Sequence, residues 1–487
     1  MFNRNINWRQ IKVAPKPGLI AHSDDLNFRS MRVHFQVPLA HNDPKCTKTI
    51  QLHAELVYGD GKSLKHDLSI DGLIKALGPL TSPLTVYLCG GPGSDNPAFA
   101  SPGLTKLLLD RIGTPVLYLS YRGTWPKKDD GKLLENRITA ATFAGLKPEQ
   151  AAQRLMLYLQ DSIVADFEAV RLYLNKLCNK DIKFALVGQS YGGWIAMTYL
   201  SFLPESLARG WLAGGMPPVG KKPDEVYTAL YKRVVKRNEK YYENYPEDVG
   251  RVWEIVQFLA GLNDGKGIKL PDGQWLSARG FLTMGRHFGS SEGFRKVHAL
   301  VESFDRHDKQ YYGFENVEMV FRLRERPLYA VLHEAIYCYG VGVVPDWAAQ
   351  RIGMGQPGGH YAWVNKEFQF KYDASKAPPA LYFSGEMIFD FMLRDAGEDQ
   401  NAFVAASEML AQYKDWPELY DVNALESNTV PLTALMYPED MFVDYTLSKK
   451  AAGMVKNCEP LKAPDDWAHA DLKSNPVAVG AKLFALK

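Results

Sequence analysis

A serine flanked by glycines is the first candidate for chemistry. Gly188-Gln189-Ser190-Tyr191-Gly192 has the G-x-S-x-G spacing, in which small residues on both sides permit a sharp turn that exposes the serine hydroxyl. A serine held in this way can attack a carbonyl carbon and form an acyl-enzyme. The spacing alone is weakly specific, because Gly289-Ser290-Ser291-Glu292-Gly293 matches it too.

The surroundings of the two serines separate them. Ser190 follows the apolar run Phe184–Val187 and precedes Trp194–Leu200, so it is predicted to lie between a buried strand and a helix. The positive end of that helix would favour a developing oxyanion. No convincing strand precedes Ser291. We therefore predict that Ser190 is a nucleophile and not a structural serine.

An acid and a base follow Ser190 in the order that such a nucleophile requires, which is Ser, then Asp or Glu, then His. Among the histidines beyond Ser190, only His469 comes after the late apolar run Val430–Tyr437. Asp440 falls in the turn after that run, where its carboxylate could hold the imidazole in the correct tautomer. Asp444 is the alternative acid.

Backbone amides are the expected stabilisers of the oxyanion. One should come from Tyr191, directly after the serine. The other should come from Gly91 in Cys89-Gly90-Gly91-Pro92-Gly93, a loop in which glycines permit a close approach of the backbone. A plain tight turn is the alternative interpretation of this loop.

The elements that must position these residues are strands alternating with helices, a pattern that predicts a mostly parallel central sheet flanked by helices. Together with the serine turn, it predicts the α/β-hydrolase fold. The expected elements are an antiparallel pair, Met31–Leu39 and Ile50–Tyr58, buried strands at Leu84–Cys89, Val116–Tyr121, Phe184–Val187 and Gly210–Ala213, and a helix at Asp161–Lys176.

The composition and periodicity of the sequence change near Pro217. From there to Ser427 it is rich in aromatic and charged residues with helical periodicity, which predicts a large, mainly helical cap inserted before the acid-bearing strand. Val430–Tyr437 resembles a strand again, and Asn475–Lys487 a final helix. The predicted division is residues 1–216 and 428–487 for the two parts of the core, with 217–427 as the cap.

Composition excludes several classes of function. The 487 residues carry a formal net charge of +2 without a dense basic run, so binding to nucleic acid is not expected. The five cysteines are scattered and include no C-x-x-C, which argues against a disulfide framework or a zinc site. The polar N-terminus is not a secretory signal, and no apolar window of 18 residues predicts a membrane span. The expected location is the cytoplasm, and no metal or cofactor is implied.

These motifs together resemble the proline iminopeptidases, or prolyl aminopeptidases, which are peptidases of the α/β-hydrolase fold. The resemblance spans roughly residues 85 to 475 and rests on Gly90–Gly93, Asp161–Glu168, Gly188–Gly193, Glu439–Asp444 and His469. One departure is Ser120-Tyr121-Arg122-Gly123-Thr124, where the family often has Asp-Gln-Arg-Gly; Arg122 and Gly123 are retained.

The resemblance implies an enzyme that removes N-terminal residues, preferably proline, from small peptides through an acyl-enzyme. It also implies that Glu334 and Glu386, in cap segments similar to those of the family, bind the free α-amino group of the substrate. Salt bridges within the cap are the alternative role for both glutamates.

Three rival functions remain at this point. An esterase or amidase would share the catalytic residues without needing the two cap glutamates, and an aminopeptidase of broader specificity would need no preference for proline. A non-catalytic binding protein would have no reason to keep the three candidates in order. Epoxide and haloalkane hydrolases need a carboxylate at the nucleophile position, which Ser190 contradicts.

Overall fold

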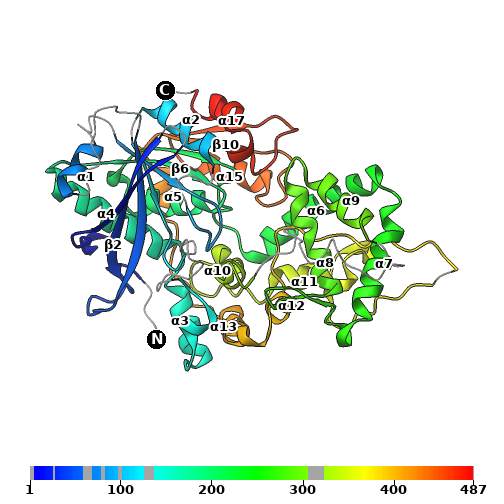
Figure 1. Cartoon of the computed structure of the whole chain (residues 1–487). Helices are drawn as coiled ribbons and strands as arrows, with labels where there is room; N and C mark the ends of the chain where they lie inside the picture. Colours follow the sequence, from blue (N-terminus) through cyan, green and yellow to red (C-terminus); the bar gives the residue numbers. More distant parts are fainter. Residues whose placement is uncertain are drawn as a thin grey trace.

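The fold is built on one large twisted sheet (Figure 1). The computed structural model describes residues 5–25, 28–58, 69–77, 83–96, 101–113, 115–124, 137–304, 323–373 and 375–485. Nine strands pair in the order β1-β2-β3-β5-β4-β6-β7-β10-β11. Their bounds are β1 Gly18–Asp25, β2 Phe28–Pro38, β3 Thr49–Tyr58, β4 Leu84–Leu88, β5 Val116–Leu119, β6 Phe184–Gln189, β7 Leu207–Ala213, β10 Leu432–Met436 and β11 Cys458–Lys462.

The pairing follows from the apolar pattern of each strand. Along β2, Met31, Val33, Phe35 and Val37 are buried in alternation with partly exposed residues, as in a strand that covers the core with one face. This strand pairs antiparallel with β1 and β3, so the predicted antiparallel pair is confirmed. Strands β4, β5, β6 and β10 are buried along their whole length. Strand β4 pairs in parallel with β5 and β6, and β7 pairs in parallel with β6 and β10, as buried central strands do, while β5 pairs antiparallel with β3 on its other side.

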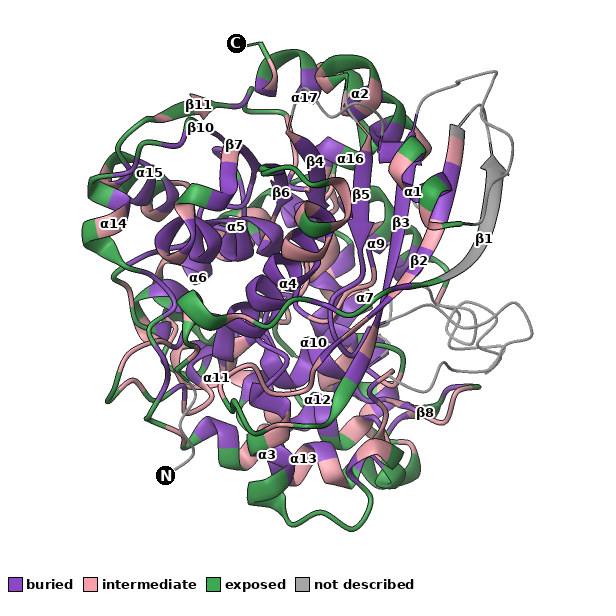
Figure 2. Cartoon of the chain, turned by 90° about the vertical axis from the view of Figure 1, so that its left-hand side faces the viewer, coloured by how far each residue is buried: buried purple, intermediate pink, exposed green. Residues whose placement is uncertain are grey.

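Two groups of helices flank the sheet. Helices α4 (Gln160–Cys178) and α5 (Tyr191–Phe202) pack against each other and against strands β2, β4, β6 and β7. Helices α2 (Pro102–Ile112), α16 (Asp471–Ser474) and α17 (Pro476–Leu483) form the second group, against β5, β7 and β10. Figure 2 shows buried residues concentrated along the central strands and the helix faces turned to them. This is the α/β-hydrolase fold, as predicted.

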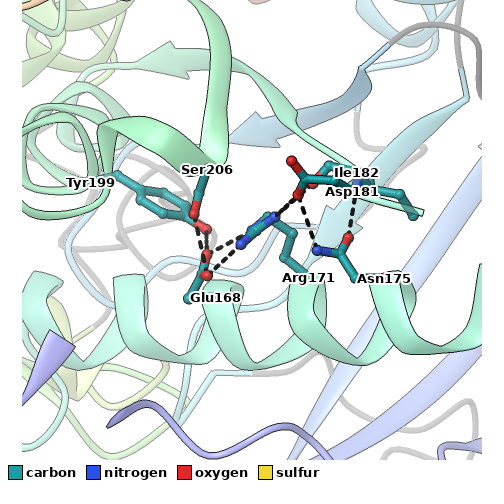
Figure 3. Close-up of polar contacts among 7 residues, drawn as sticks. All are labelled: Glu168, Arg171, Asn175, Asp181, Ile182, Tyr199 and Ser206. Atoms are coloured by element: carbon teal, nitrogen blue, oxygen red, sulfur yellow. Dashed lines mark hydrogen bonds and ion pairs between the residues drawn. The ribbon is translucent and has the colours of Figure 1, made fainter. Parts of the chain in front are cut away.

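A buried ion pair fastens α4 to its neighbours (Figure 3). The Glu168 carboxylate accepts hydrogen bonds from Arg171 at 2.7 and 2.9 Å and from the Tyr199 hydroxyl of α5 at 2.6 Å. Ser206, just before β7, donates to the same carboxylate at 3.2 Å. Every charge here is paired and hydrogen-bonded, which is the condition under which charges can be buried without a large penalty.

The segment between β7 and β10 is mainly helical and lies to one side of the sheet in Figure 1. Its longest helix, α6 (Pro223–Asn244), buries Val226, Leu230 and Val234 at helical spacing. The division at residues 217 and 427 stays a prediction. The other α-helices of this segment are α7 Asp248–Ala260, α8 Ala278–Leu282, α9 Gly293–Glu302, α10 Pro327–Leu332, α11 Ala348–Met354, α12 Asp390–Asp395, α13 Asn401–Ala411 and α14 Val422–Glu426. The segment also contains a short hairpin of β8 (Ile268–Lys269) and β9 (Trp275–Leu276).

Several elements differ from expectation. Strands β1 and β11 were not anticipated, and the last helix runs over Pro476–Leu483, shorter than the predicted Asn475–Lys487, of which residues 486 and 487 lie outside the described part. Helices α1 (Ile70–Leu77), α3 (Pro148–Met156) and α15 (Tyr445–Met454) complete the core side of the chain, and α3 packs against α13. No described helix combines the length and the apolar character needed to cross a membrane.

The turn after β5, where the sequence departs from the related family, is held by a buried arginine. Arg122 donates to both carboxylate oxygens of Asp166 on α4, at 2.7 and 2.8 Å. Its remaining donors reach the backbone oxygens of Pro38, Leu39 and Leu157 at 2.6 to 2.9 Å. The retained Arg122 therefore joins the end of β2, the turn after β5 and α4.

The Arg122–Asp166 pair predicts a large effect on stability. Asp166→Asn leaves a guanidinium buried without its counter-charge, so the free energy of unfolding should fall by about 3–5 kcal/mol. Denaturant titration measures it. The matched control is Asp110→Asn, whose partner Lys106 is exposed, and it should cost less than about 1 kcal/mol. Equal effects of the two substitutions would contradict this assignment.

Candidate active site

Ser190 occupies the sharp turn between β6 and α5. Its backbone has φ 52° and ψ −126°, an unusual conformation for a residue with a side chain, at a cost of about 1–3 kcal/mol. The Ser190 amide donates to Ala213 at 3.1 Å, and the Ser190 carbonyl accepts from Gly193 at 2.7 Å. These bonds hold the strained turn between the ends of β6 and β7, with the serine side chain only partly buried.

The glycines after the serine are required by close packing. A Cβ on Gly192 would lie 2.1 Å from the Leu88 carbonyl oxygen at the end of β4, and one on Gly193 would lie 1.7 Å from the Gly215 carbonyl oxygen. Both distances are far inside van der Waals contact. Helix α5 can therefore begin this close to the sheet only because both positions lack a side chain.

His469 and Asp440 meet although the chain separates them by 29 residues. Nδ1 of His469 lies 2.7 Å from Oδ2 of Asp440. The other oxygen, Oδ1, accepts hydrogen bonds from the amides of Phe442 at 2.8 Å and Val443 at 3.0 Å. These two amides fix the carboxylate, so it can orient the imidazole with Nε2 directed away from it.

The charges around His469 set its protonation. Burial on its own lowers the pKa of the imidazole, but the negative charge and hydrogen bond of Asp440 raise it, and the charge of Glu386 adds to the rise. The positive charge of Lys473 acts in the opposite direction. The net result is a raised pKa, which makes His469 a stronger base.

The alternative acid, Asp444, is engaged elsewhere. Its Oδ1 accepts from the Leu447 amide at 2.9 Å and so caps the start of α15. Its Oδ2 accepts from Nε of Arg233 on α6 at 2.8 Å. The geometry therefore brings Asp440, and not Asp444, to His469.

The glycine loop after β4 lies against the serine. A Cβ on Gly90 would be 3.1 Å from Cβ and 3.5 Å from Oγ of Ser190, so the loop that contains Gly91 approaches the hydroxyl. Tyr191 is the first residue of α5, where helix amides point out of the helix. No hydrogen bond joins Ser190 to His469 within the described residues, and such bonds often tighten only when substrate is bound.

Glu386, one of the two predicted amine-binding residues, lies near the histidine. Its Oε1 accepts a hydrogen bond from the Tyr329 hydroxyl, and Oε2 lies 3.9 Å from Nε2 of His333. Burial raises the pKa of this carboxyl, but His333, His469 and the Tyr329 hydroxyl outweigh burial and lower it. Glu386 is therefore a carboxylate near neutral pH, with 23% of its side chain exposed.

Glu334 has different surroundings. Its Oε1 accepts from the Ala349 amide at 3.0 Å, in the first turn of α11. Burial raises the pKa of this carboxyl to about 8, although the amides of α11 and Arg351 act against the rise. Glu334 is thus largely protonated at neutral pH and already bonded within the cap. The structure does not give the two glutamates equivalent positions.

Sequence reasoning missed the residues that hold Glu386. Tyr329 lies within α10 and His333 directly follows it, both are buried, and nothing in their pattern separates them from ordinary core residues. The second G-x-S-x-G match also has a packing explanation. A Cβ on Gly289 would lie 2.2 Å from the Phe442 ring, whose edge packs against His469 with centroids 4.9 Å apart.

Two known proteins are similar to this sequence over most of its length. The chain is 32% identical over 426 residues to a proline iminopeptidase of Aeromonas sobria, covering 87% of this chain and 88% of that protein. It belongs to the proline iminopeptidase family. It is also 29% identical over 478 residues to the proline iminopeptidase aneH of Aspergillus aculeatus, covering 96% of this chain and 95% of that protein.

A solved structure of a protein described as related to the proline iminopeptidases is also similar to this chain. A proline iminopeptidase-related protein of Thermus thermophilus is 14% identical, with a TM-score of 0.36, covering 89% of this chain and 92% of that one. No protein-family model matches the chain.

The contact between His469 and Asp440 predicts that a substitution at Asp440 changes the pKa of His469. Asp440→Asn removes the charge that raises the pKa of His469, so the imidazole should protonate only at a lower pH than in the unchanged protein. NMR titration of the ring protons measures this. Asp444→Asn is the matched control, since Asp444 contacts Arg233 and not His469, and should leave the His469 titration in place. A lower pKa in the control alone would assign the acid to Asp444.

Proposed function

We propose that the protein is a serine aminopeptidase that releases N-terminal residues, preferably proline, from peptides with a free N-terminus. The observation that carries this proposal is the His469–Asp440 pair, assembled at the sheet edge where Ser190 is held in a strained turn. Membership of the proline iminopeptidase family supports the peptidase activity and the preference for proline.

The reaction follows from these positions. His469 accepts the proton of the Ser190 hydroxyl as the oxygen attacks the substrate carbonyl, and Asp440 stabilises the imidazolium that forms. The amides of Gly91 and Tyr191 donate to the oxyanion. His469 then protonates the leaving amine, and water hydrolyses the acyl-enzyme by the reverse proton path.

The substrate amine is anchored in this proposal by Glu386. Its carboxylate is charged, partly exposed and close enough to His469 for their charges to interact, so a cationic N-terminus bound there would place the first carbonyl near the reacting groups. Glu334 takes part as the second carboxyl of the amine site. Its bond to α11 and its raised pKa support a weaker contribution, which a cationic amine could increase by favouring deprotonation.

We assign residues 217–427 to a cap that supplies Glu386 and closes over the core formed by 1–216 and 428–487. The packing of Gly289 against Phe442 supports this arrangement, since it joins the cap to the loop that carries Asp440. We also assign the protein to the cytoplasm, because its five cysteines are free thiols, as is usual in a reducing compartment.

Removal of the serine hydroxyl tests the mechanism. Ser190→Ala should lower the rate of hydrolysis of prolyl naphthylamide by about 10⁴-fold or more, because the acyl-enzyme forms on the Ser190 oxygen. Fluorescence of the released naphthylamine measures the rate. Ser291→Ala, in the second motif, is the matched control and should retain nearly full activity. Activity that survives Ser190→Ala would overturn the proposed mechanism.

The amine site is tested with substrates that differ in the amine. Glu386→Gln should lower kcat/KM for prolyl naphthylamide by about 10- to 100-fold, and much less for a simple ester that has no amine. The control is Glu367→Gln, an exposed cap glutamate, which should change neither. If Glu386→Gln left aminopeptidase activity intact while ester hydrolysis dominated, the proposed amine site would be wrong and an esterase would be the better description.

A further inference from the structure

A cavity of about 550 Å³ opens beside the serine, and the catalytic proposal does not use it. Its lining includes Gly90 and Gly93 of the glycine loop, together with Leu328 at the start of α10. A Cβ on Gly90 would lie 3.1 Å from Cβ of Ser190, so the Gly90 end of the cavity is close to the serine. We call it the Lys473 cavity, after the lysine that lines it four residues beyond His469.

Positive charge exceeds negative charge in this cavity. Its lining carries Arg137, Arg326 and Lys473 against Asp95 and Glu325. Arg137 is already engaged, since it lies 3.8 Å from the Asp95 carboxylate and donates to the Glu325 backbone oxygen. Among the described residues, no carboxylate forms an ion pair with Arg326 or Lys473.

The charge of Lys473 reaches the catalytic histidine. It acts on His469 strongly enough to oppose the rise of that pKa, so the lysine and the reacting groups share one electrostatic environment. Lys473 follows His469 on the chain through the short helix α16, which fixes the two residues relative to one another. An anion held by Lys473 would therefore lie within a short distance of the bond that is cleaved.

A second crevice, which is lined by His469, carries an excess of negative charge. It measures about 260 Å³ and is lined by Asp440 and His469. Its other charged residues are Arg237 and Lys240 on the cap, against Glu439, Asp465 and Asp466 on the core. With Asp440, the acidic residues outnumber the basic ones, and an anionic group would be repelled. The glycine loop lines the Lys473 cavity and does not line this crevice, while Ser190 itself lines neither of them.

We propose that the Lys473 cavity receives the leaving fragment of the substrate, and that Lys473 and Arg326 bind a carboxylate carried by that fragment. The inference rests on the proposed function, in which Glu386 holds the amine and Ser190 attacks the first carbonyl. The residues after the cleaved bond must then occupy space beside the glycine loop, and the cavity supplies that space. Its volume is in the range of small-molecule sites, which suits a fragment of one or a few residues.

The carboxylate can come from two sources, the C-terminus of a short peptide or an acidic side chain at the second position. Both offer the same charge to a lysine and an arginine. A preference for the C-terminal carboxylate would make di- and tripeptides better substrates than longer chains, since only a short fragment brings its terminus into the cavity.

The test compares paired substrates on the intact chain. Pro-Gly and its C-terminal amide differ only in the terminal carboxylate, and Pro-Asp amide and Pro-Asn amide differ only in the side-chain carboxylate. The measured quantity is the ratio of kcat/KM within each pair, because damage to catalysis in general lowers both members equally. The proteins are the unchanged chain, Lys473→Gln, Arg326→Gln and the control Lys482→Gln on α17.

We expect the unchanged protein to favour the acid member of at least one pair by about tenfold or more, as a charge-assisted contact would produce. Lys473→Gln should bring that ratio towards one, Arg326→Gln should lower it, and Lys482→Gln should leave it unchanged. The pair that responds identifies the source of the carboxylate.

Equal rates within both pairs would overturn this inference and leave the proposed function standing. So would an acid preference that survives both Lys473→Gln and Arg326→Gln. If none of the four substrates lost its proline, the proposed function would fail, and the role of the cavity would fail with it.

Discussion

The contact between the start of α5 and the ends of the neighbouring strands is the constraint on which the rest of the site depends. Gly192 and Gly193 approach backbone oxygens so closely that no side chain fits at either position. This contact forces the backbone of Ser190 into its strained conformation and leaves its hydroxyl beside the glycine loop. The strain is sustained because the surrounding strands are buried and fully paired, so relaxing the turn would disrupt the centre of the sheet.

Charge organises the residues around that turn. Asp440 raises the basicity of His469 and Glu386 adds to the effect, while the positive charge of Lys473 opposes it. The segment between β7 and β10 therefore contributes to both proposed roles, since the carboxylate proposed to bind the substrate amine also acts on the proposed catalytic base. A bound amine would reduce the negative charge that His469 experiences, which couples substrate binding to proton transfer.

Arg122 is retained in the turn after β5, where the sequence otherwise departs from the family pattern, and it holds that turn in place. The turn after β5 lacks the family's Asp-Gln, but its arginine still spans Asp166 and three backbone oxygens. The requirement at this position is for a buried fork of donors that joins α4 to the sheet. The residues before the arginine are not part of that fork, and Tyr121 instead donates its hydroxyl to the Cys89 backbone oxygen at 2.8 Å.

Much of the fold followed from the sequence alone. The buried runs are continuous and apolar, so the central strands could be predicted. Ser190, Asp440 and His469 occur in the necessary order, and the triad they form stays a prediction. Strand β11 could not be predicted, because it is a short, largely exposed strand with Pro460 in it and carries no apolar pattern. Strand β1 was not predicted either. Only the tertiary structure showed that Asp440 contacts His469 and Asp444 contacts Arg233, and that Glu334 and Glu386 have different surroundings. The protonation and partners of a carboxyl depend on burial and on charges from distant segments, which residue type and spacing do not encode.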